Sequence, residues 1–484
     1  MSSIAKIPVT RSPIAKNVKE ERQPVVLPDY CKACGRCIEA CNKDCITLSS
    51  DINPATGLHY AIVDLDQCNS CGLCLSACPE PYGMKPKTYD FDALEAADLP
   101  EARNDYEPAA ADIPDEILPL ADTEPLVIRG TYASAIGALV AGCRHFYGYP
   151  ITPSTEGAEL MAKLLPQLEG VFVQAISEVA TINMMFGCGA AGKRSLTFTS
   201  SPGFSLMLEG LSYMIGAEVP AVVVNVMRGG PGLGNIAPEQ ADIKLACRGL
   251  GHGNTHGIVL APSTPQEMLD LTILAFDLAF KYRNPVIVVC DGYLGQMTGR
   301  VTLPRQMVKP GLPGWAVWGD AAHRPNLVSS IHLTEADLEM HNQRLGRKYA
   351  EIREKEQRAD VFQCDDADVV LVACNTPSRM AKGAVRELRE RGVRAGLFRP
   401  LTLWPFPVDL LVPVLRHAKR VVVIEAGHGQ LEDEMRLALS HANVVPPGVC
   451  HVQHEGGVLP QAAEIVARVM DVSQGAPDMT GGRP

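Results

Sequence analysis

Long apolar runs and a secretion signal are both absent from this sequence. No stretch of 18 consecutive apolar residues occurs, and the N-terminus has no apolar core of signal-peptide length. Basic residues do not dominate either, since 44 Lys and Arg stand against 55 Asp and Glu, a net charge of -11. These absences exclude a membrane protein and argue against a nucleic-acid-binding surface. We expect no membrane partner, no nucleic-acid partner and a cytoplasmic location.

Nucleotide-binding motifs and disulfide patterns are missing as well. The glycine-rich stretch 228–235 contains no Walker lysine and does not fit G-x-G-x-x-G. Of the 16 cysteines, eight are scattered without a pairing pattern. Free cysteines in such numbers indicate a reducing compartment.

The other eight cysteines form two copies of C-x2-C-x2-C-x3-C. This spacing lets three thiolates of one loop bind one face of an iron–sulfur cubane, while the fourth cysteine ligates the other cluster. The segment resembles a bacterial two-cluster ferredoxin over residues 26–86, with Asn42 where that family often has proline. We assign cluster one to Cys31, Cys34, Cys37 and Cys78, and cluster two to Cys68, Cys71, Cys74 and Cys41. Zinc needs only paired C-x2-C, and a buried thiol explains Cys45 better than a ligand role.

From residue 126 onward, apolar runs alternate with helical periodicity, which predicts parallel sheets covered by helices. The strands are expected at 171–174, 195–199, 221–226, 257–260 and 285–290, then 369–373, 395–399 and 421–425. Helices are expected at 132–144, 178–191, 203–217, 264–281, 334–358, 378–391, 408–417 and 429–441. Thr334 and Asp337 fit a capping pair at the start of the charged helix 334–358.

The predicted organisation has seven parts. They are an arm (1–25), a small ferredoxin-like α+β domain (26–86), a linker (87–121), an α/β domain (122–304), a connecting segment (305–359), a second α/β domain (360–474) and a tail (475–484). The length of 484 residues fits roughly three domains.

Three stretches carry candidate site residues, each with two interpretations. The turn 149–156 is either a rigid turn capped by Ser154 or Thr155, or an anion site. Glu178 opens a helix, and is either a partner of the helix dipole or a buried acid that protonates a heterocycle. Arg228 heads the glycine-rich loop, which is either a tight turn or a place where a guanidinium binds a carboxylate.

Two further patterns are weaker. His252 and His256 have i,i+4 spacing, but glycines forbid a stable helix there, and a metal pair is not favoured. Asp291-Gly292 lacks the leading glycine and the Asn-Asn of the thiamine-diphosphate signature, so we interpret it as an ordinary strand end.

Residues 122–474 resemble the alpha subunit of 2-oxoacid:ferredoxin oxidoreductases. The matching motifs are Tyr-Pro-Ile-Thr-Pro-Ser-Thr-Glu (149–156), Ser-Pro-Gly-Phe-Ser-Leu-Met (201–207), Arg-Gly-Gly-Pro (228–231), Lys-Tyr-Arg-Asn-Pro-Val (281–286) and Arg-Pro-Leu-Thr-Leu-Trp-Pro (399–405). The resemblance implies a thiamine pyrimidine-binding-like domain followed by one like the C-terminal domain of transketolase. It implies that Thr152 and Arg228 face the 2-oxoacid carboxylate, and that Glu178 contacts the aminopyrimidine of thiamine diphosphate.

The resemblance also implies partners. A beta subunit would carry the diphosphate-binding motif with Mg2+, so that thiamine diphosphate is shared between chains, and a gamma subunit would serve the CoA side. The complex would convert a 2-oxoacid and CoA to acyl-CoA and CO2, passing electrons through two [4Fe-4S] clusters to ferredoxin or another acceptor. The loop 228–235 favours a branched-chain or aryl 2-oxoacid over 2-oxoglutarate. The alternative is a non-catalytic electron-relay and assembly subunit; a transketolase-type enzyme is disfavoured by the clusters.

Overall fold

The computed structural model describes residues 21–54, 56–80, 82–90 and 110–473. Most of the expected arm, part of the linker and the tail lie outside these ranges. The chain divides into two compact units, Met1–Tyr106 and Glu107–Pro484. Each is described by itself below. In the described part of the chain, no helix is long and apolar enough to cross a membrane.

The small unit consists of two antiparallel strand pairs and two short helices. Strand β1 pairs with β4, and β2 with β3. The elements are β1 (Pro24–Val26), η1 (Pro28–Tyr30), α2 (Arg36–Glu39), β2 (Ile46–Ile52), β3 (His59–Val63), α3 (Leu73–Ala77) and β4 (Met84–Pro86). Half of its buried core is cysteine, with Cys37, Cys45 and Cys74 beside Ile46, Ala61 and Met84. So small a core buries little apolar surface.

The large unit is built on a seven-stranded sheet in the order β18-β11-β12-β10-β9-β7-β8. All neighbours pair in parallel except β18, which runs antiparallel to β11. The strands are β7 (His145–Gly148), β8 (Val171–Gln174), β9 (Ser195–Thr199), β10 (Ala221–Met227), β11 (Ile258–Leu260), β12 (Pro285–Asp291) and β18 (Thr402–Trp404). Every residue of β9, β10 and β12 is buried, as expected for strands covered on both faces.

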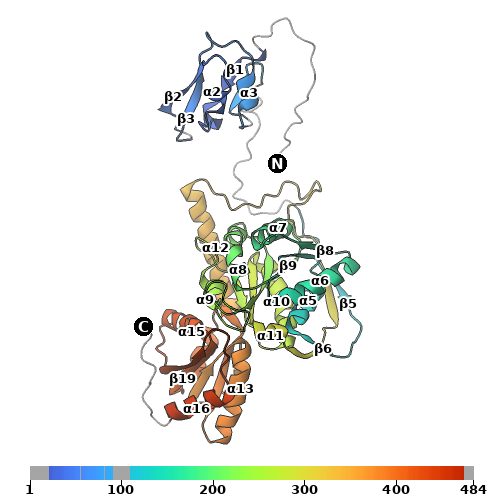
Figure 1. Cartoon of the computed structure of the whole chain (residues 1–484), viewed down its shortest axis with the longest axis vertical. Helices are drawn as coiled ribbons and strands as arrows, with labels where there is room; N and C mark the ends of the chain where they lie inside the picture. The colour runs from blue at the N-terminus through green and yellow to red at the C-terminus, as the bar shows by residue number, and fades with distance from the viewer. Residues whose placement is uncertain (1–20, 55, 81, 91–109, 474–484) are drawn as a thin grey trace. The chain divides into compact units, whose positions relative to one another are not determined.

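Helices cover this sheet, and two small strand pairs border it (Figure 1). Helix α5 packs against α10, and α7 against α8. The helices are α5 (Gly130–Val140), α6 (Thr155–Leu164), η2 (Leu165–Leu168), α7 (Glu178–Ala190), α8 (Ser201–Gly216), α9 (Ile243–Arg248), α10 (Pro265–Tyr282) and α11 (Gly292–Gln296). The strand pairs are β5 (Glu116–Pro119) with β14 (Gln306–Lys309) and β6 (Leu126–Arg129) with β13 (Thr298–Val301). The end of the expected linker is therefore ordered: β5 pairs with β14, and buried Arg194 binds Asp115 at 2.5 Å.

A five-stranded sheet in the order β15-β17-β16-β19-β20 forms the second part of the large unit. Its pairs are parallel apart from β15 with β17. The elements are β15 (Ala359–Phe362), β16 (Val369–Val372), β17 (Ala395–Pro400), β19 (Arg420–Ala426), β20 (Gly448–His454), α13 (Asn375–Glu390), α14 (Val408–Leu415), α15 (Gln430–His441) and α16 (Ala462–Ser473). The two α/β parts with parallel sheets confirm the expected fold class, and the predicted strands and helices are confirmed to within a few residues at their ends.

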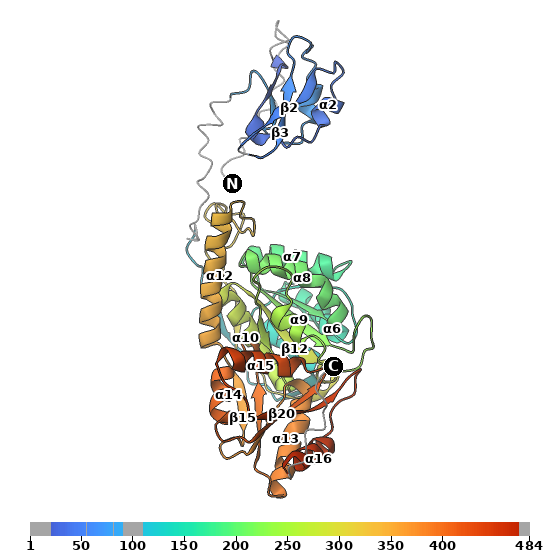
Figure 2. The ribbon, with the colours of Figure 1, turned by 90° about the vertical axis from the view of Figure 1, so that its left-hand side faces the viewer.

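Helix α12 (Glu335–Lys355) joins the two sheets and lies along the outside of the large unit (Figure 2). The hydroxyl of Thr334 accepts the Asp337 amide at 3.1 Å, which confirms the predicted cap. Buried Glu218, just after α8, binds Arg344 at 2.7 Å and Lys348 at 3.1 Å on α12. The charged helix is thus held by a buried ionic network as well as by its cap.

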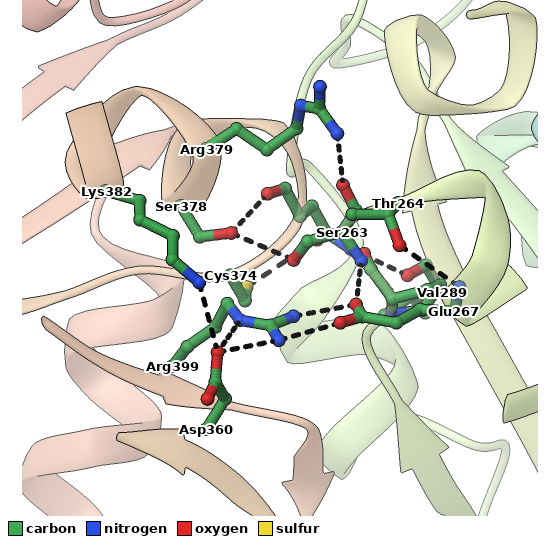
Figure 3. Close-up of polar contacts among 12 residues, drawn as sticks. Ser263, Thr264, Glu267, Val289, Asp360, Cys374, Ser378, Arg379, Lys382 and Arg399 are labelled. Carbon is green, nitrogen blue, oxygen red and sulfur yellow. Dashed lines mark hydrogen bonds and ion pairs between the residues drawn. The ribbon is translucent and has the colours of Figure 1, made fainter. Parts of the chain in front are cut away.

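The two sheets are joined by a buried arginine and by strand β18, which follows β17 in the chain and pairs in the first sheet. Arg399 of β17 makes two hydrogen bonds of 2.7 Å to Glu267 on α10 and one of 3.0 Å to Asp360 (Figure 3). Strand β18 lies within the sequence range expected to form the second domain, yet it completes the first sheet. The motif 399–405 therefore holds the two sheets together.

Candidate functional site

The two cysteine runs have the same local backbone. Gly35 and Gly72 have φ of 77° and 79° and lie directly before α2 and α3. Ala33 and Ser70, at matching positions of the two runs, have φ of 54° and 55°. Left-handed backbone at these positions turns each loop so that its cysteines converge.

Four cysteines of the first expected set lie around one cavity. Cys31, Cys34, Cys37 and Cys78 line it together with Ala61 and Met84. The thiol of Cys37 has a raised pKa, first because it is buried and then because Cys31 and Cys78 are close. A cavity lined by four cysteines fits the ligand chemistry of a cubane cluster.

The second set gathers around Cys74 and Cys41. Burial raises the pKa of Cys74 to about 11, and the nearby Cys68 and Cys71 add to it. Cys45 connects Cys41 with this group, since its Sγ is 3.4 Å from the Sγ of Cys41. Cys45 also has a raised pKa, from burial and from Cys41 and Cys68. Cys45 is thus the buried thiol that the sequence suggested, and it is in contact with the second set.

Within the described residues, no three His, Cys, Asp or Glu side chains are close enough to hold a single metal ion. His252 and His256 have different surroundings: His256 stacks on Trp404 at 4.5 Å, whereas His252 lies edge-on to Tyr213.

Glu178 is a buried acid at the start of α7. Its side chain is 4% exposed, and the helix is capped instead by the preceding Ser177, which accepts the Ala180 amide at 3.2 Å. The carboxylate lies against Gly203, where an added Cβ would collide with Glu178 Oε1 and lie 2.5 Å from Thr199 Oγ1. The Thr199 hydroxyl is buried and has no hydrogen-bond partner among the described residues. Burial of this kind favours the buried-acid interpretation over a solvated dipole partner.

Arg228 follows β10 at the carboxyl edge of the sheet, where ligands of such sheets bind. Its side chain is 7% exposed. Nη1 donates to the Thr152 carbonyl at 2.8 Å, and Nη2 to the Leu233 carbonyl at 3.3 Å. Nε is buried and has no partner among the described residues. Thr152 itself is exposed, and the structure brings it to Arg228 through its backbone oxygen.

The start of α8 connects Glu178 and Arg228. The Ser201 hydroxyl accepts the Arg228 amide at 3.1 Å and donates to buried Asp242 at 2.5 Å, while Gly203, two residues on, packs against Glu178. Burial raises the pKa of Asp242, whereas its bonds to Ser201 and Asn225 and the nearby Arg228 oppose that rise. The sequence contained the Ser-Pro-Gly motif between a strand and a helix, but nothing in it indicated Asp242.

One other expectation is corrected. The Ser154 hydroxyl donates to the Ile151 carbonyl at 2.8 Å and accepts no amide of α6, so the predicted side-chain cap is wrong. Asp291 ends β12, as expected, and it also accepts both the amide and the hydroxyl of Thr376 at 2.8 Å, which binds β12 to α13.

Comparison with known proteins shows which families the chain resembles. The family descriptions that match are "Pyruvate flavodoxin/ferredoxin oxidoreductase, thiamine diP-bdg" over residues 136–369, "Pyruvate:ferredoxin oxidoreductase core domain II" over 367–465, and "4Fe-4S dicluster domain" over 30–81. The ketoisovalerate oxidoreductase subunit VorB of Methanothermobacter thermautotrophicus is 43% identical over 354 residues, covering 73% of this chain and 99% of that protein. The 2-oxoglutarate synthase subunit KorA of Methanocaldococcus jannaschii is 37% identical, covering 66% of this chain and 93% of that protein.

One solved structure is also similar. The 2-oxoglutarate:ferredoxin oxidoreductase of Magnetococcus marinus matches with a TM-score of 0.65 and 28% identity. The match covers 72% of this chain and 65% of that one. The chain therefore belongs to the 2-oxoacid:ferredoxin oxidoreductase subunits, and it combines a thiamine diphosphate-binding domain with a 4Fe-4S dicluster domain.

Proposed function

We propose that this chain is the alpha-type subunit of a CoA-dependent 2-oxoacid:ferredoxin oxidoreductase. Its reaction would be R-CO-COO⁻ + CoA-SH → R-CO-S-CoA + CO2 + H⁺ + two electrons. Thiamine diphosphate would supply the nucleophilic carbon and the electron sink for decarboxylation, and iron–sulfur clusters would carry the electrons singly. The observation that carries the proposal is that buried Glu178 and Arg228 contact the same turn, the start of α8.

Glu178 would hold the proton exchanged with the aminopyrimidine ring. Its burial against Gly203 and Thr199 keeps water away from the carboxylate, and the first turn of α7 fixes its direction. A carboxylate can hold and release a proton at Oε1, whereas an amide cannot. The chain lacks the diphosphate-binding motif, so we infer that a beta subunit supplies it together with Mg2+.

Arg228 would bind the substrate carboxylate, with Thr152 beside it. Two of its five N–H groups donate hydrogen bonds to carbonyls, which orients the guanidinium and leaves other donors for an anion. A planar fork that is already oriented binds a carboxylate with less loss of entropy.

The same loop supports a substrate with one carboxylate and an apolar tail. Leu233 is 80% and Ile236 is 61% exposed, and both follow Arg228 in the loop. We therefore rank branched-chain or aryl 2-oxoacids first and 2-oxoglutarate second. The order of identity among the relatives, 43% to a ketoisovalerate oxidoreductase subunit and 37% to a 2-oxoglutarate synthase subunit, supports this ranking.

The small unit would pass the electrons on. We propose that Cys31, Cys34, Cys37 and Cys78 hold one cluster, that Cys68, Cys71, Cys74 and Cys41 hold the other, and that ferredoxin or a similar carrier is the acceptor. None of the sixteen cysteines, all of them among the described residues, forms a disulfide, in keeping with a reducing, cytoplasmic setting. A gamma subunit for the CoA side completes the proposed complex.

The test is viologen reduction by the purified complex with a panel of 2-oxoacids plus CoA. We expect rates that depend on both the 2-oxoacid and CoA and are highest with a branched-chain or aryl acid. A complex that accepts electrons but converts no 2-oxoacid would support the other interpretation, an electron-relay and assembly subunit.

A further inference from the structure

The loop that carries Arg228 touches a second loop from the other sheet. It closes on itself, because the Gly229 amide donates to the Ala237 carbonyl at 3.0 Å and the Asn235 amide to the Gly229 carbonyl at 3.2 Å. The segment after β20, residues 455–457, lies against this closed loop. Two parts of the chain more than 200 residues apart thus meet at the proposed carboxylate site.

Glu239 binds both loops. It is 6% exposed, and its Oε2 accepts the Gly230 amide at 3.3 Å. The Gly456 backbone amide lies near this carboxylate and favours its charged form. Asn235 completes the contact by donating to the Gly456 carbonyl at 3.0 Å. The segment around Gly456 is therefore held against the Arg228 loop.

Glycine is required on the other side of this contact. Gly456 and Gly457 have φ of 64° and 97°, which L side chains rarely adopt. An added Cβ at Gly457 would collide with the Cβ of Ala237. Only a glycine pair lets the segment 455–457 approach the Arg228 loop this closely.

We propose that Glu239 is a positioning residue, which, together with Gly456–Gly457, holds the Arg228 loop in the conformation that binds the substrate carboxylate. This inference rests on the proposed role of Arg228. Glu239 acts through the backbone of Gly230 and does not touch the substrate. Because every 2-oxoacid has the same carboxylate, loss of Glu239 should weaken the binding of all of them alike.

The charge of Glu239 gives a second, independent signature. Burial raises its pKa, the Gly230 and Gly456 amides oppose the rise, and nearby Glu455 and Asp242 add to it. The charged groups around it also include Arg228, near Asp242, and His428, which pairs with Glu455. The ionised carboxylate accepts the Gly230 amide, and attracts the nearby Gly456 amide, more strongly than the acid. The kcat/KM of the wild-type complex should therefore fall as the pH drops through this raised pKa.

The experiment compares Glu239→Gln with wild type in the whole complex. We expect KM for every 2-oxoacid to rise about fivefold to fiftyfold, with KM for CoA unchanged. The fall of kcat/KM toward acid pH, the acid limb of the pH profile, should also become less steep. Gly457→Ala should give the same rise in KM from the opposite side of the contact. Glu351→Gln is the matched control, since this carboxylate is exposed and pairs with Lys355 on α12.

Three outcomes overturn the inference: an unchanged KM in Glu239→Gln, a selective effect on one 2-oxoacid, or an acid limb that persists in the variant. The last would assign the titration to Asp242 or Glu455.

Arg228→Lys separates the two proposals. If it raises KM while Glu239→Gln does not, only the positioning role fails; if Arg228→Lys changes nothing, the proposed carboxylate site fails. If the Glu239→Gln complex does not assemble, Glu239→Asp serves instead. Aspartate keeps the negative charge, but its shorter side chain moves the carboxylate away from the Gly230 amide. An unchanged KM in Glu239→Asp would also overturn the proposal.

Discussion

The small unit and the large unit build their sites in opposite ways. In the small unit, the proposed ligands fall between Cys31 and Cys78 in two copies of one spacing, and short loops set their geometry. In the large unit, Glu178 and Arg228 come from different strand–helix connections, and α8 brings them together. A site of the first kind is determined by the spacing of residues in a short segment, whereas one of the second kind depends on the packing of the whole sheet. Substitutions in the two units should therefore impair different properties, turnover in the large unit and cluster binding in the small one.

The largest effect is expected from Glu178→Gln. An amide occupies the same space but cannot hold the exchanged proton, so turnover should fall at least about a hundredfold. The iron content and the visible absorption of the clusters should not change, because the substitution lies in the other unit. Viologen reduction and iron analysis of the same preparation measure both quantities. A rate close to wild type would return Glu178 to the role of a partner of the helix dipole.

Cys71→Ser tests the small unit in the same way. One cubane should be lost, so the iron bound by the small unit should fall from about eight atoms to about four. Reduction of the external carrier should slow, while substrate-dependent CO2 exchange continues in the large unit.

Cys45→Ser is the matched control for Cys71→Ser, since this cysteine is buried beside Cys41 without belonging to either run. Loss of iron in Cys45→Ser would make Cys45 a ligand. Loss of CO2 exchange in an assembled Cys71→Ser complex would contradict the separation of the two sites.

These two sites also show which features could be predicted from the sequence and which could not. The 4Fe-4S dicluster domain and most strands and helices were predictable, because spacing and periodicity are local properties. Thr334 as a cap was predictable for the same reason. The pairing of β18 with β11 was not, because antiparallel addition to the edge of a distant sheet leaves no local pattern. The family resemblance implied roles for Glu178 and Arg228, but the roles of Ser201 and Asp242 became visible only through contacts across the fold.

Long-range contacts should also dominate the stability of the large unit. Burial raises the pKa of Glu218, but Lys348 and Arg344 outweigh that effect and leave it lowered. A lowered carboxylate pKa contributes stability above the pKa of the unfolded chain, and that stability is lost as the pH falls. Glu218→Gln should cost about 3 kcal/mol at neutral pH because it leaves the buried Lys348 without its charge partner.

Thermal or urea unfolding across the acid range measures this cost. The difference between Glu218→Gln and wild type should shrink as the pH falls. A constant difference at all pH values would show that packing, and not charge, accounts for the loss.

Arg228→Lys should have an effect of about 1–3 kcal/mol on kcat/KM. Lysine keeps the charge but lacks the planar fork that bonds to the Thr152 and Leu233 carbonyls. The loss should be similar for each 2-oxoacid, since all share the carboxylate. Steady-state kinetics with branched-chain, aryl and 2-oxoglutarate substrates measures it. A much larger loss for one acid would mean that Arg228 binds that substrate's side chain, which would favour 2-oxoglutarate.

The smallest effect is expected from Thr334→Ala, a local feature within the large unit. The Thr334 hydroxyl satisfies one free amide at the start of α12, and its removal should cost about 1 kcal/mol. Thr334→Ser keeps the hydroxyl and should cost almost nothing. Farther along α12, Arg344 and Lys348 bind Glu218, and His341 bonds to the Gly216 carbonyl at 2.7 Å. These contacts should hold the helix in place when the cap is lost, so urea unfolding should show a smaller loss for Thr334→Ala than for Glu218→Gln. The reverse order would mean that α12 is fixed mainly by its own sequence, and the large unit would then depend on local signals as much as the small one.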